Sequence, residues 1–235
     1  MRSAVLRPAA NRGKGGEPSR GRQALLLAGL LAGVFLVGMA IAGFYLSLSY
    51  RPPAGDSAEA GFARDMSTHH AQAVQMAEIV GRRTEDGAIR QLATDIMLTQ
   101  QGQIGQMQGW LAAWRLPLTG DEAPMTWMGH PTEGLMPGMA SPEDVSTLET
   151  LPPDEADEEF LRLMIPHHEA AIPMAEAVLD ETDRPEVETL AGAIAASQQN
   201  EIAVMEDMLR GRGAALPEAP AEGAPHGGGH AGHGG

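Results

Sequence analysis

Two stretches of this sequence are near-copies of each other, displaced by a constant 98 residues. The segment that begins at Phe62 matches the segment that begins at Phe160. The segments that follow them match at the same offset, without a gap. Chance does not give so long a match, so the chain is predicted to contain a duplicated unit. The recurring residues include Met66 and Met164, His69 and His167, His70 and His168, Met76 and Met174, Ile96 and Ile194, Gln100 and Gln198, and Met107 and Met205.

Each copy contains two stretches whose apolar residues follow the period of an α-helix. In the stretch 62–80 the apolar and histidine positions fall within about 120° of arc, the width of a core-facing stripe. The stretch 92–111 makes a similar stripe with Gln100 near its middle. One helix pair is too thin to bury such stripes alone. We therefore expect an all-α protein, a ferritin-like four-helix bundle over residues 57–213 that is made of two duplicated helix pairs.

Local signals indicate the ends of these helices. Gly81 is expected to follow the first helix, and the acidic run 154–159 is expected to open the third, where carboxylates favour the helix dipole. Asp183 with Glu186 resembles a capping box at the start of the fourth helix.

A long uncharged segment precedes the repeat. Residues 24–50 carry no charged side chain, and as a helix they would be about 40 Å long, more than the ~30 Å hydrocarbon core of a bilayer needs. Basic residues crowd the N-terminal side, so the positive-inside rule predicts a cytoplasmic N-terminus at 1–23 and an extracytoplasmic domain after a linker at 51–56. The alternative is a signal peptide cleaved near Ala40-Ile41-Ala42, but the apolar run is about twice the usual ~7–15 residues. We predict a single-pass cell-membrane protein with one uncleaved transmembrane helix that contacts the lipid bilayer.

Composition removes several classes of function. The chain has no cysteine, which excludes disulfides, thiolate catalysis and iron–sulfur clusters. Residues beyond 50 carry 10 basic and 30 acidic groups, and the chain is 4% aromatic, so nucleic acid is not expected as a partner. The sequence has no phosphate-binding loop, nucleophile elbow, His-Glu-x-x-His motif or Glu-x-x-His motif, so an enzyme is not predicted.

Two regions lie outside the repeat. Residues 117–153 form a connector that is long for a compact domain, with a short helix expected from Ser141. The Gly-rich tail 214–235 is predicted to be disordered. Its three histidines are a weak signal for loose binding of copper(II), nickel or zinc, and they are His226, His230 and His233.

The most specific chemical pattern is Met-x-x-His-His-x5-Met, which occurs once in each copy. Residues three, four and seven apart share a face of a helix. Imidazole and thioether groups are both metal donors, and the soft thioether favours copper(I). The pattern therefore predicts a copper site. Its candidate ligands are Met66, His69, His70, Met76, Met164, His167, His168 and Met174.

An alternative interpretation exists for each of these residues. Methionine on an apolar helical face is usually core filler. Adjacent histidines on such a face bind a metal or take part in a buried hydrogen-bond network. Gln100 and Gln198 either hold the ring nitrogens in place or form a polar pair that fixes the register of the bundle. Pro166 and Pro173 flank the second histidine pair and either splay it toward a site or merely bend the helix.

The connector supplies further candidates in the patterns Met-x-x-Met-x-His and Met-x-x-Met. Proline and glycine interrupt any regular packing face here, so these methionines either bind soft metal or dock against the bundle, with Trp127 as a lid or an anchor. The candidate ligands are Met125, Met128, His130, Met136 and Met139.

At these residues the chain resembles the bacterial domain-of-unknown-function family numbered 305. The resemblance rests on the segment 160–171 with Met174-Ala175, on 197–205, and on 136–143, and it covers essentially residues 57–212. It implies a ferritin-like four-helix bundle that is exported or membrane-anchored. Because members include copper-binding proteins linked to copper tolerance, it also implies metal roles for the His-His pairs and the neighbouring methionines. The first copy departs from the family pattern at Asp65-Met66-Ser67-Thr68, where many members have a second methionine and a proline.

The sequence thus predicts a membrane-tethered extracytoplasmic protein that binds a copper ion, as copper(I), for buffering or delivery. One rival is a metal-free helical interaction module that docks another envelope protein or a second copy of the chain. A less favoured rival is a ferritin-like redox enzyme, which would need inward carboxylate ligands.

Overall fold

The computed structural model describes residues 20–49 and 51–217, and the predictions for the remaining residues of both termini, including the tail histidines, lie outside this range. The chain divides into two compact units at Arg51, which we describe separately. All regular elements in the described residues are helical, which confirms the all-α bundle; the ferritin-like assignment stays a prediction. The elements are α1 (Arg20–Ser49), α2 (Ala58–Arg83), α3 (Gly87–Trp114), the 3-10 helix η1 (Thr126–Met128), α4 (Pro142–Thr150), α5 (Pro153–Glu181) and α6 (Pro185–Gly211).

Helix α1 forms the first unit by itself. Its segment Gly21–Phe44 has a mean hydropathy of 2.6 and is long and apolar enough to cross a membrane. Its large apolar side chains, among them Leu30 and Phe35, are exposed in the isolated helix, as expected of side chains that face lipid. An uncleaved anchor and a signal sequence both meet these criteria, so the choice between them stays a prediction.

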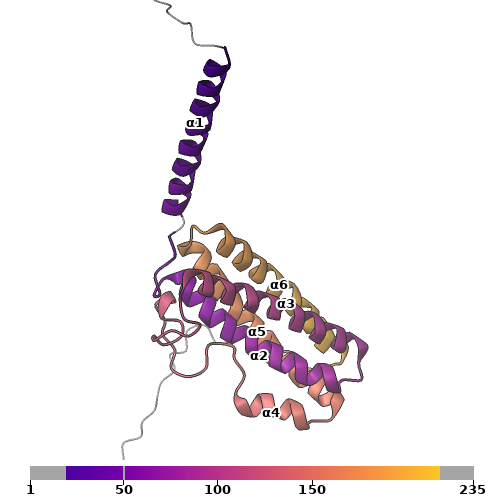
Figure 1. Cartoon of the computed structure of the whole chain (residues 1–235). Coiled ribbons are helices and arrows are strands. Elements are labelled where there is room, and N and C mark those ends of the chain that lie inside the picture. The colour runs from indigo at the N-terminus through magenta and orange to yellow at the C-terminus, as the bar shows by residue number, and fades with distance from the viewer. Residues whose placement is uncertain (1–19, 50, 218–235) are drawn as a thin grey trace, which may run out of the picture. The chain divides into compact units, whose positions relative to one another are not determined.

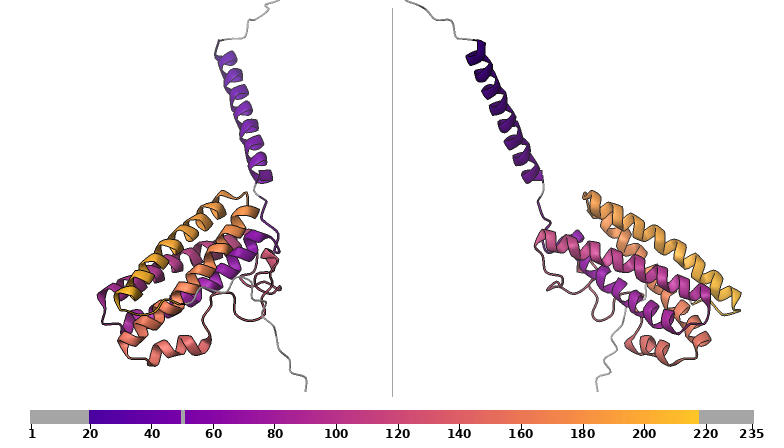
Figure 2. Two further views of the ribbon diagram at one scale, coloured as in Figure 1. Left: turned by 180° about the vertical axis from the view of Figure 1, so that it is seen from behind. Right: turned by 45° about the vertical axis from the view of Figure 1, so that its right-hand side comes forward.

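The second unit is built from two helical hairpins. Helix α2 packs against α3 and α5, and α5 packs against α6, while α4 lies across α2 and α5 at one end (Figures 1 and 2). Helix α5 continues without a break through Pro166 and Pro173. The duplicated segments of the sequence are therefore the two hairpins, and their copies of the histidine pattern lie on the adjacent helices α2 and α5.

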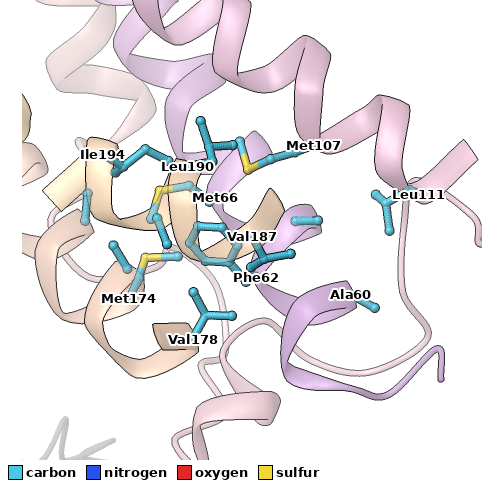
Figure 3. Close-up of a cluster of buried hydrophobic side chains, with 14 of the residues drawn as sticks. Ala60, Phe62, Met66, Met107, Leu111, Met174, Val178, Val187, Leu190 and Ile194 are labelled. Carbon is cyan, nitrogen blue, oxygen red and sulfur yellow. The ribbon is translucent and has the colours of Figure 1, made fainter. Parts of the chain in front are cut away.

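Two apolar clusters fill the bundle, one toward each end. The first contains the N-terminal part of α2 and the C-terminal part of α5, with Phe62, Met66 and Met174 in mutual proximity (Figure 3). The second contains Met76 and Met164 from the opposite parts of the same helices. This pairing makes α2 and α5 antiparallel. Between the two clusters lies a layer of the bundle whose residues belong to neither cluster.

Two expectations for helix ends were wrong. Helix α2 continues past Gly81 to Arg83, and Gly81 lies where α2 packs against α3, with room for a Cβ at an ordinary van der Waals distance of 3.5 Å from the Ala93 side chain. Helix α6 begins at Pro185 with no side-chain cap, so the capping box predicted from Asp183 is absent. Proline suits the first helical position because its missing N–H is one that has no partner inside the helix.

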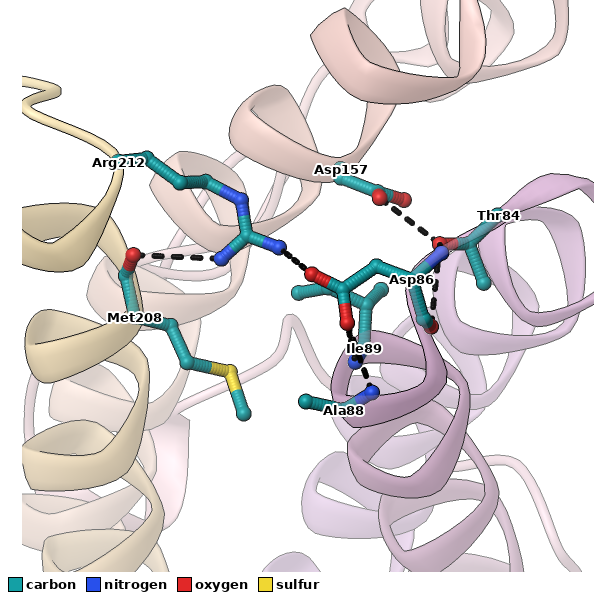
Figure 4. Close-up of polar contacts among 7 residues, drawn as sticks. All are labelled: Thr84, Asp86, Ala88, Ile89, Asp157, Met208 and Arg212. Carbon is teal, nitrogen blue, oxygen red and sulfur yellow. Dashed lines mark hydrogen bonds and ion pairs between the residues drawn. The ribbon is translucent and has the colours of Figure 1, made fainter.

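A polar cluster joins the loop between α2 and α3 to the last residues of α6 (Figure 4). Asp86 caps α3 by accepting hydrogen bonds from the backbone N–H groups of Ala88 at 2.7 Å and Ile89 at 3.4 Å, and it also pairs with Arg212. Nearby, the Thr84 hydroxyl donates to the buried Asp157 carboxylate at 2.7 Å. The cluster holds the far ends of the two hairpins together.

Removal of this cap is the first testable change. Asp86→Ala is expected to lower the free energy of unfolding by about 1–2 kcal/mol, because two backbone donors of α3 lose their acceptor. Glu85→Ala, in the same loop and exposed, is the matched control. Urea unfolding followed by circular dichroism measures both, and equal midpoints for the two variants would show that the cap does not stabilise the hairpin.

Candidate metal centre

Four histidines occupy the level between the two apolar clusters. His69 and His70 project from α2, and His167 and His168 project from α5, and we call these four side chains the histidine layer. Each is at most 1% exposed. Their placement follows from helical spacing, since each pair stands between apolar residues one turn away on the same buried stripe. Burial of four polar rings requires compensation, because an unpaired polar atom loses its hydrogen bonds to water.

The two copies of the pattern meet at one ring pair. The ring centroids of His69 and His167 lie 3.8 Å apart, with 36° between the ring planes. These two residues occupy equivalent positions of the repeat. The His167 and His168 centroids lie 6.3 Å apart. The fold thus brings together rings that are far apart in the sequence.

Three of the four rings use their Nε2 atom in a hydrogen bond. His69 Nε2 lies 3.1 Å from the carbonyl oxygen of Pro137, His70 Nε2 lies 2.8 Å from Gln103 Oε1, and His168 Nε2 lies 2.7 Å from Glu201 Oε2. A carbonyl or carboxylate oxygen only accepts, so it places the ring proton on Nε2. The Nδ1 atom of each neutral ring then carries a free lone pair.

Five ring nitrogens of the layer have no hydrogen-bond partner among residues 20–49 and 51–217. They are Nδ1 of His69, His70 and His168 and both nitrogens of His167. Each unpartnered buried polar atom costs about 1–3 kcal/mol. A cation that accepts the lone pairs would relieve this cost. The hydrogen bonds on Nε2 also match the arrangement in which a histidine ligand donates its second N–H to a carboxylate or backbone carbonyl.

Burial disfavours protonation of His69, His70 and His167. Burial lowers the pKa of His69 from 6.5 to about 4 and that of His70 from 6.5 to about 3. Burial also lowers the pKa of His167 well below its usual value, and the charges that its three neighbouring histidines would carry add to the effect. Neutral imidazole is the form in which a histidine can bind a metal ion.

The predicted glutamine partners of the histidines were wrong. Gln100 is buried, but neither atom of its side-chain amide has a hydrogen-bond partner, and the Gln198 side-chain oxygen also lacks one. The actual partners, Gln103 and Glu201, stand three residues later on α3 and α6. They occupy equivalent positions of the repeat, but they are not identical residues, since one is glutamine and the other glutamate. The signal that could have found them is their shared offset of 98 residues.

The methionines of the helical pattern flank the histidine layer within the apolar clusters. Met66 and Met174 are fully buried in the first cluster, where Figure 3 shows their thioethers among aliphatic side chains. Met76 and Met164 are fully buried in the second cluster. These positions agree with a role in core packing, and ligation by their sulfur atoms stays a prediction. Within residues 20–49 and 51–217, no three His, Asp or Glu side chains form a ready-made metal cluster.

The connector methionines dock against the bundle. Met125 and Met136 are buried in the first apolar cluster, Met128 and Met139 are half-buried against it, and His130 is exposed. Trp127 is an anchor, because its indole N–H donates to Asp65 at 2.9 Å and its ring packs edge-on against Phe62. A second metal site in the connector therefore stays a prediction, because no group of His, Asp or Glu side chains that could hold a metal ion is found there among the described residues.

Fold and site together define a duplicated helical bundle with a buried layer of four histidines. The chain belongs to the Domain of unknown function (DUF305) family, whose sequence profile matches residues 59–209.

Several solved structures resemble the chain. A DUF305 protein of Streptomyces coelicolor is 44% identical over 70% of this chain and 99% of its own, with a TM-score of 0.67. A DUF305 fragment of Deinococcus radiodurans is 41% identical over 66% of this chain and 96% of its own, with a TM-score of 0.57. CopM in its Cu(I)-bound form is 29% identical over 66% of this chain and 97% of its own, but its TM-score of 0.49 is too low to transfer its ligand.

Among curated proteins, an uncharacterized protein of Acanthamoeba polyphaga mimivirus is 43% identical over 46 residues. That match covers 20% of this chain and 30% of the viral protein, so the chain aligns with less than a third of that relative.

Proposed function

We propose that the protein binds copper(I) in the histidine layer and that helix α1 tethers it to a membrane, with the bundle on the extracytoplasmic side. The observation that carries the proposal is His167, a fully buried ring whose two nitrogens find no hydrogen-bond partner in the described part of the chain and whose centroid lies 3.8 Å from that of its repeat equivalent His69. A bundle that needed only packing would place apolar side chains here, because an unpaired polar ring is destabilising.

The choice of copper(I) rests on the chemistry of the available donors. The layer offers neutral imidazole nitrogens, and the thioethers of Met66, Met76, Met164 and Met174 are the nearest sulfur groups along the same helices. Imidazole suits several transition metals, whereas thioether sulfur selects copper(I). Hard cations prefer oxygen ligands, and Glu201 is the one carboxylate that bonds to a ring of the layer. We assign the chain a role in buffering or delivering this ion, with no catalytic step.

The tether and its orientation rest on charge. All the basic residues before residue 50 precede the apolar segment, and the remainder of the chain is strongly acidic. The positive-inside rule then places the bundle outside the cytoplasm. An acidic domain there attracts cations in general but does not select among them, so selectivity is assigned to the histidine layer.

A metal-free interaction module is the second candidate. It is favoured by the ordinary hydrogen bonds of His69, His70 and His168, which leave only part of the layer unpaired. This candidate predicts that copper changes neither the stability nor the fluorescence of the protein.

Titration with copper(I) separates the two candidates. The full chain in detergent micelles, with His226, His230 and His233 replaced by alanine, is titrated against a chromophoric copper(I) chelator under anaerobic conditions. We expect the protein to remove copper from the chelator more strongly than a scrambled peptide of the same histidine and methionine content, because the fold orders the donors in advance. Binding no tighter than that of the peptide would refute the copper function.

A further inference from the structure

One segment of the connector lies over the histidine layer. We call residues 136–140 the covering loop. The Pro137 carbonyl accepts a hydrogen bond from His69 Nε2 at 3.1 Å. Ala140 is tied to α2 twice, because its N–H donates to Gln72 Oε1 at 2.8 Å and its carbonyl accepts from Gln72 Nε2 at 2.9 Å. The loop is therefore fixed to α2 on both sides of Gly138.

The middle of the loop reaches the backbone of α5. Gly138 has φ +73°, and a Cβ placed there would stand 2.4 Å from the Pro166 carbonyl oxygen and 3.1 Å from the His167 Cα. Only glycine allows this conformation and this approach without strain. The loop thus bridges α2 and α5 at the level of the stacked pair His69 and His167.

The loop breaks the symmetry of the duplicated bundle. Three residues of α2 that bind the connector, Asp65, His69 and Gln72, recur along one face of the helix. Their repeat equivalents on α5 are Leu163, His167 and Ala170, of which only the histidine is polar. His69 therefore receives a backbone acceptor, while its equivalent His167 receives none.

We propose that the covering loop is part of the metal site and that Gln72 is its positioning residue, so that the bound cation and the closed loop stabilise each other. This inference rests on the proposed function. The Pro137 carbonyl holds the proton of His69 on Nε2 and leaves Nδ1 as the donor. A cation on Nδ1 withdraws electron density from the ring and makes the Nε2–H group a stronger donor to Pro137. Such coupling is reciprocal, so loosening the loop weakens the site.

The test uses silver(I) as a soft monovalent probe that is stable in air. Gln72→Ala removes both bonds to Ala140, and Gly138→Ala disrupts the loop independently of Gln72. Gln75→Ala is the matched control, because Gln75 is an exposed glutamine one turn further along α2. All variants are made in the full chain with the three tail histidines replaced by alanine. The readouts are the rate of silver dissociation to an excess of chelator and hydrogen exchange at the Met139 and Ala140 amides.

We expect silver to slow exchange of the Ala140 amide by at least about tenfold in the unmodified loop. We expect both loop variants to accelerate silver dissociation by about tenfold or more, and Gln75→Ala to leave it unchanged. Two results would overturn the coupling and leave the proposed function intact. One is silver binding with the same dissociation rate in all variants, and the other is an Ala140 exchange rate that silver does not change. Failure of the unmodified loop protein to bind silver would overturn both.

Discussion

His167→Ala is expected to lower the affinity for copper(I) by at least about 100-fold while it leaves the helical content and the unfolding midpoint nearly unchanged. Loss of an outer partner of a metal ligand costs about 10–100-fold in affinity, and loss of the ligand itself costs more. The expected change in the free energy of unfolding is small because a destabilising effect and a stabilising effect offset each other. The variant creates a cavity in a buried layer, but it also removes two polar atoms that have no hydrogen-bond partner.

His130→Ala provides the matched control for this prediction. His130 is the exposed histidine of the connector, so its removal should change neither the copper affinity nor the stability. Competition with a chromophoric chelator gives the affinities, and urea unfolding monitored by circular dichroism gives the stabilities. An affinity within threefold of the parent for His167→Ala, together with a large loss of stability, would favour a histidine that serves the metal-free core.

The copper-free protein is expected to lose stability steeply as the pH falls from 6.5 toward 5. The pKa of His69 is lowered to about 4 and that of His70 to about 3, both from 6.5 in the unfolded chain, and the pKa of His167 is lowered as well. Below pH 6.5 the unfolded state therefore binds protons that the folded state does not, so the free energy of unfolding falls. His69 and His70 each contribute about 1.4 kcal/mol per pH unit, so together they contribute up to about 4 kcal/mol at pH 5, and His167 adds to this loss.

Three carboxyl groups act in the opposite direction. Burial raises the pKa of Asp65, Asp157 and Glu169, so the folded state binds their protons more readily than the unfolded state does. The contribution of a histidine is therefore isolated by comparing the parent with His167→Ala over the same pH interval. Urea unfolding at pH 7.5, 6.5, 5.8 and 5, followed by tryptophan fluorescence with a copper chelator present, measures the slope. His167→Ala should reduce the slope by about one ring's share, whereas a parent protein with pH-independent stability over this interval would contradict the prediction.

The architecture could be predicted because its signals lie along the chain. The repeat, the helical period and the Ser141 cap are each local patterns, and the structure contains the corresponding helices, with the Ser141–Asp144 capping box of α4 formed. The local signals at Gly81 and Asp183 gave wrong helix ends, because α2 continues to Arg83 and α6 begins at Pro185 without a side-chain cap. Gln100 recurs as an identical residue, but Gln103 accepts the hydrogen bond of His70, because hydrogen bonding depends on position rather than on residue identity.

The sequence by itself determined that two helix pairs would repeat, that histidines and methionines would share their buried faces, and that an apolar helix would precede them. Such properties depend on spacing, and spacing can be read from one chain. Only the tertiary structure decided that His69 stacks on His167, that the Pro137 carbonyl binds the ring of His69, and that the connector methionines are packed rather than free. These contacts join residues that are distant in sequence through an aperiodic connector, and no periodic pattern encodes where such a segment docks.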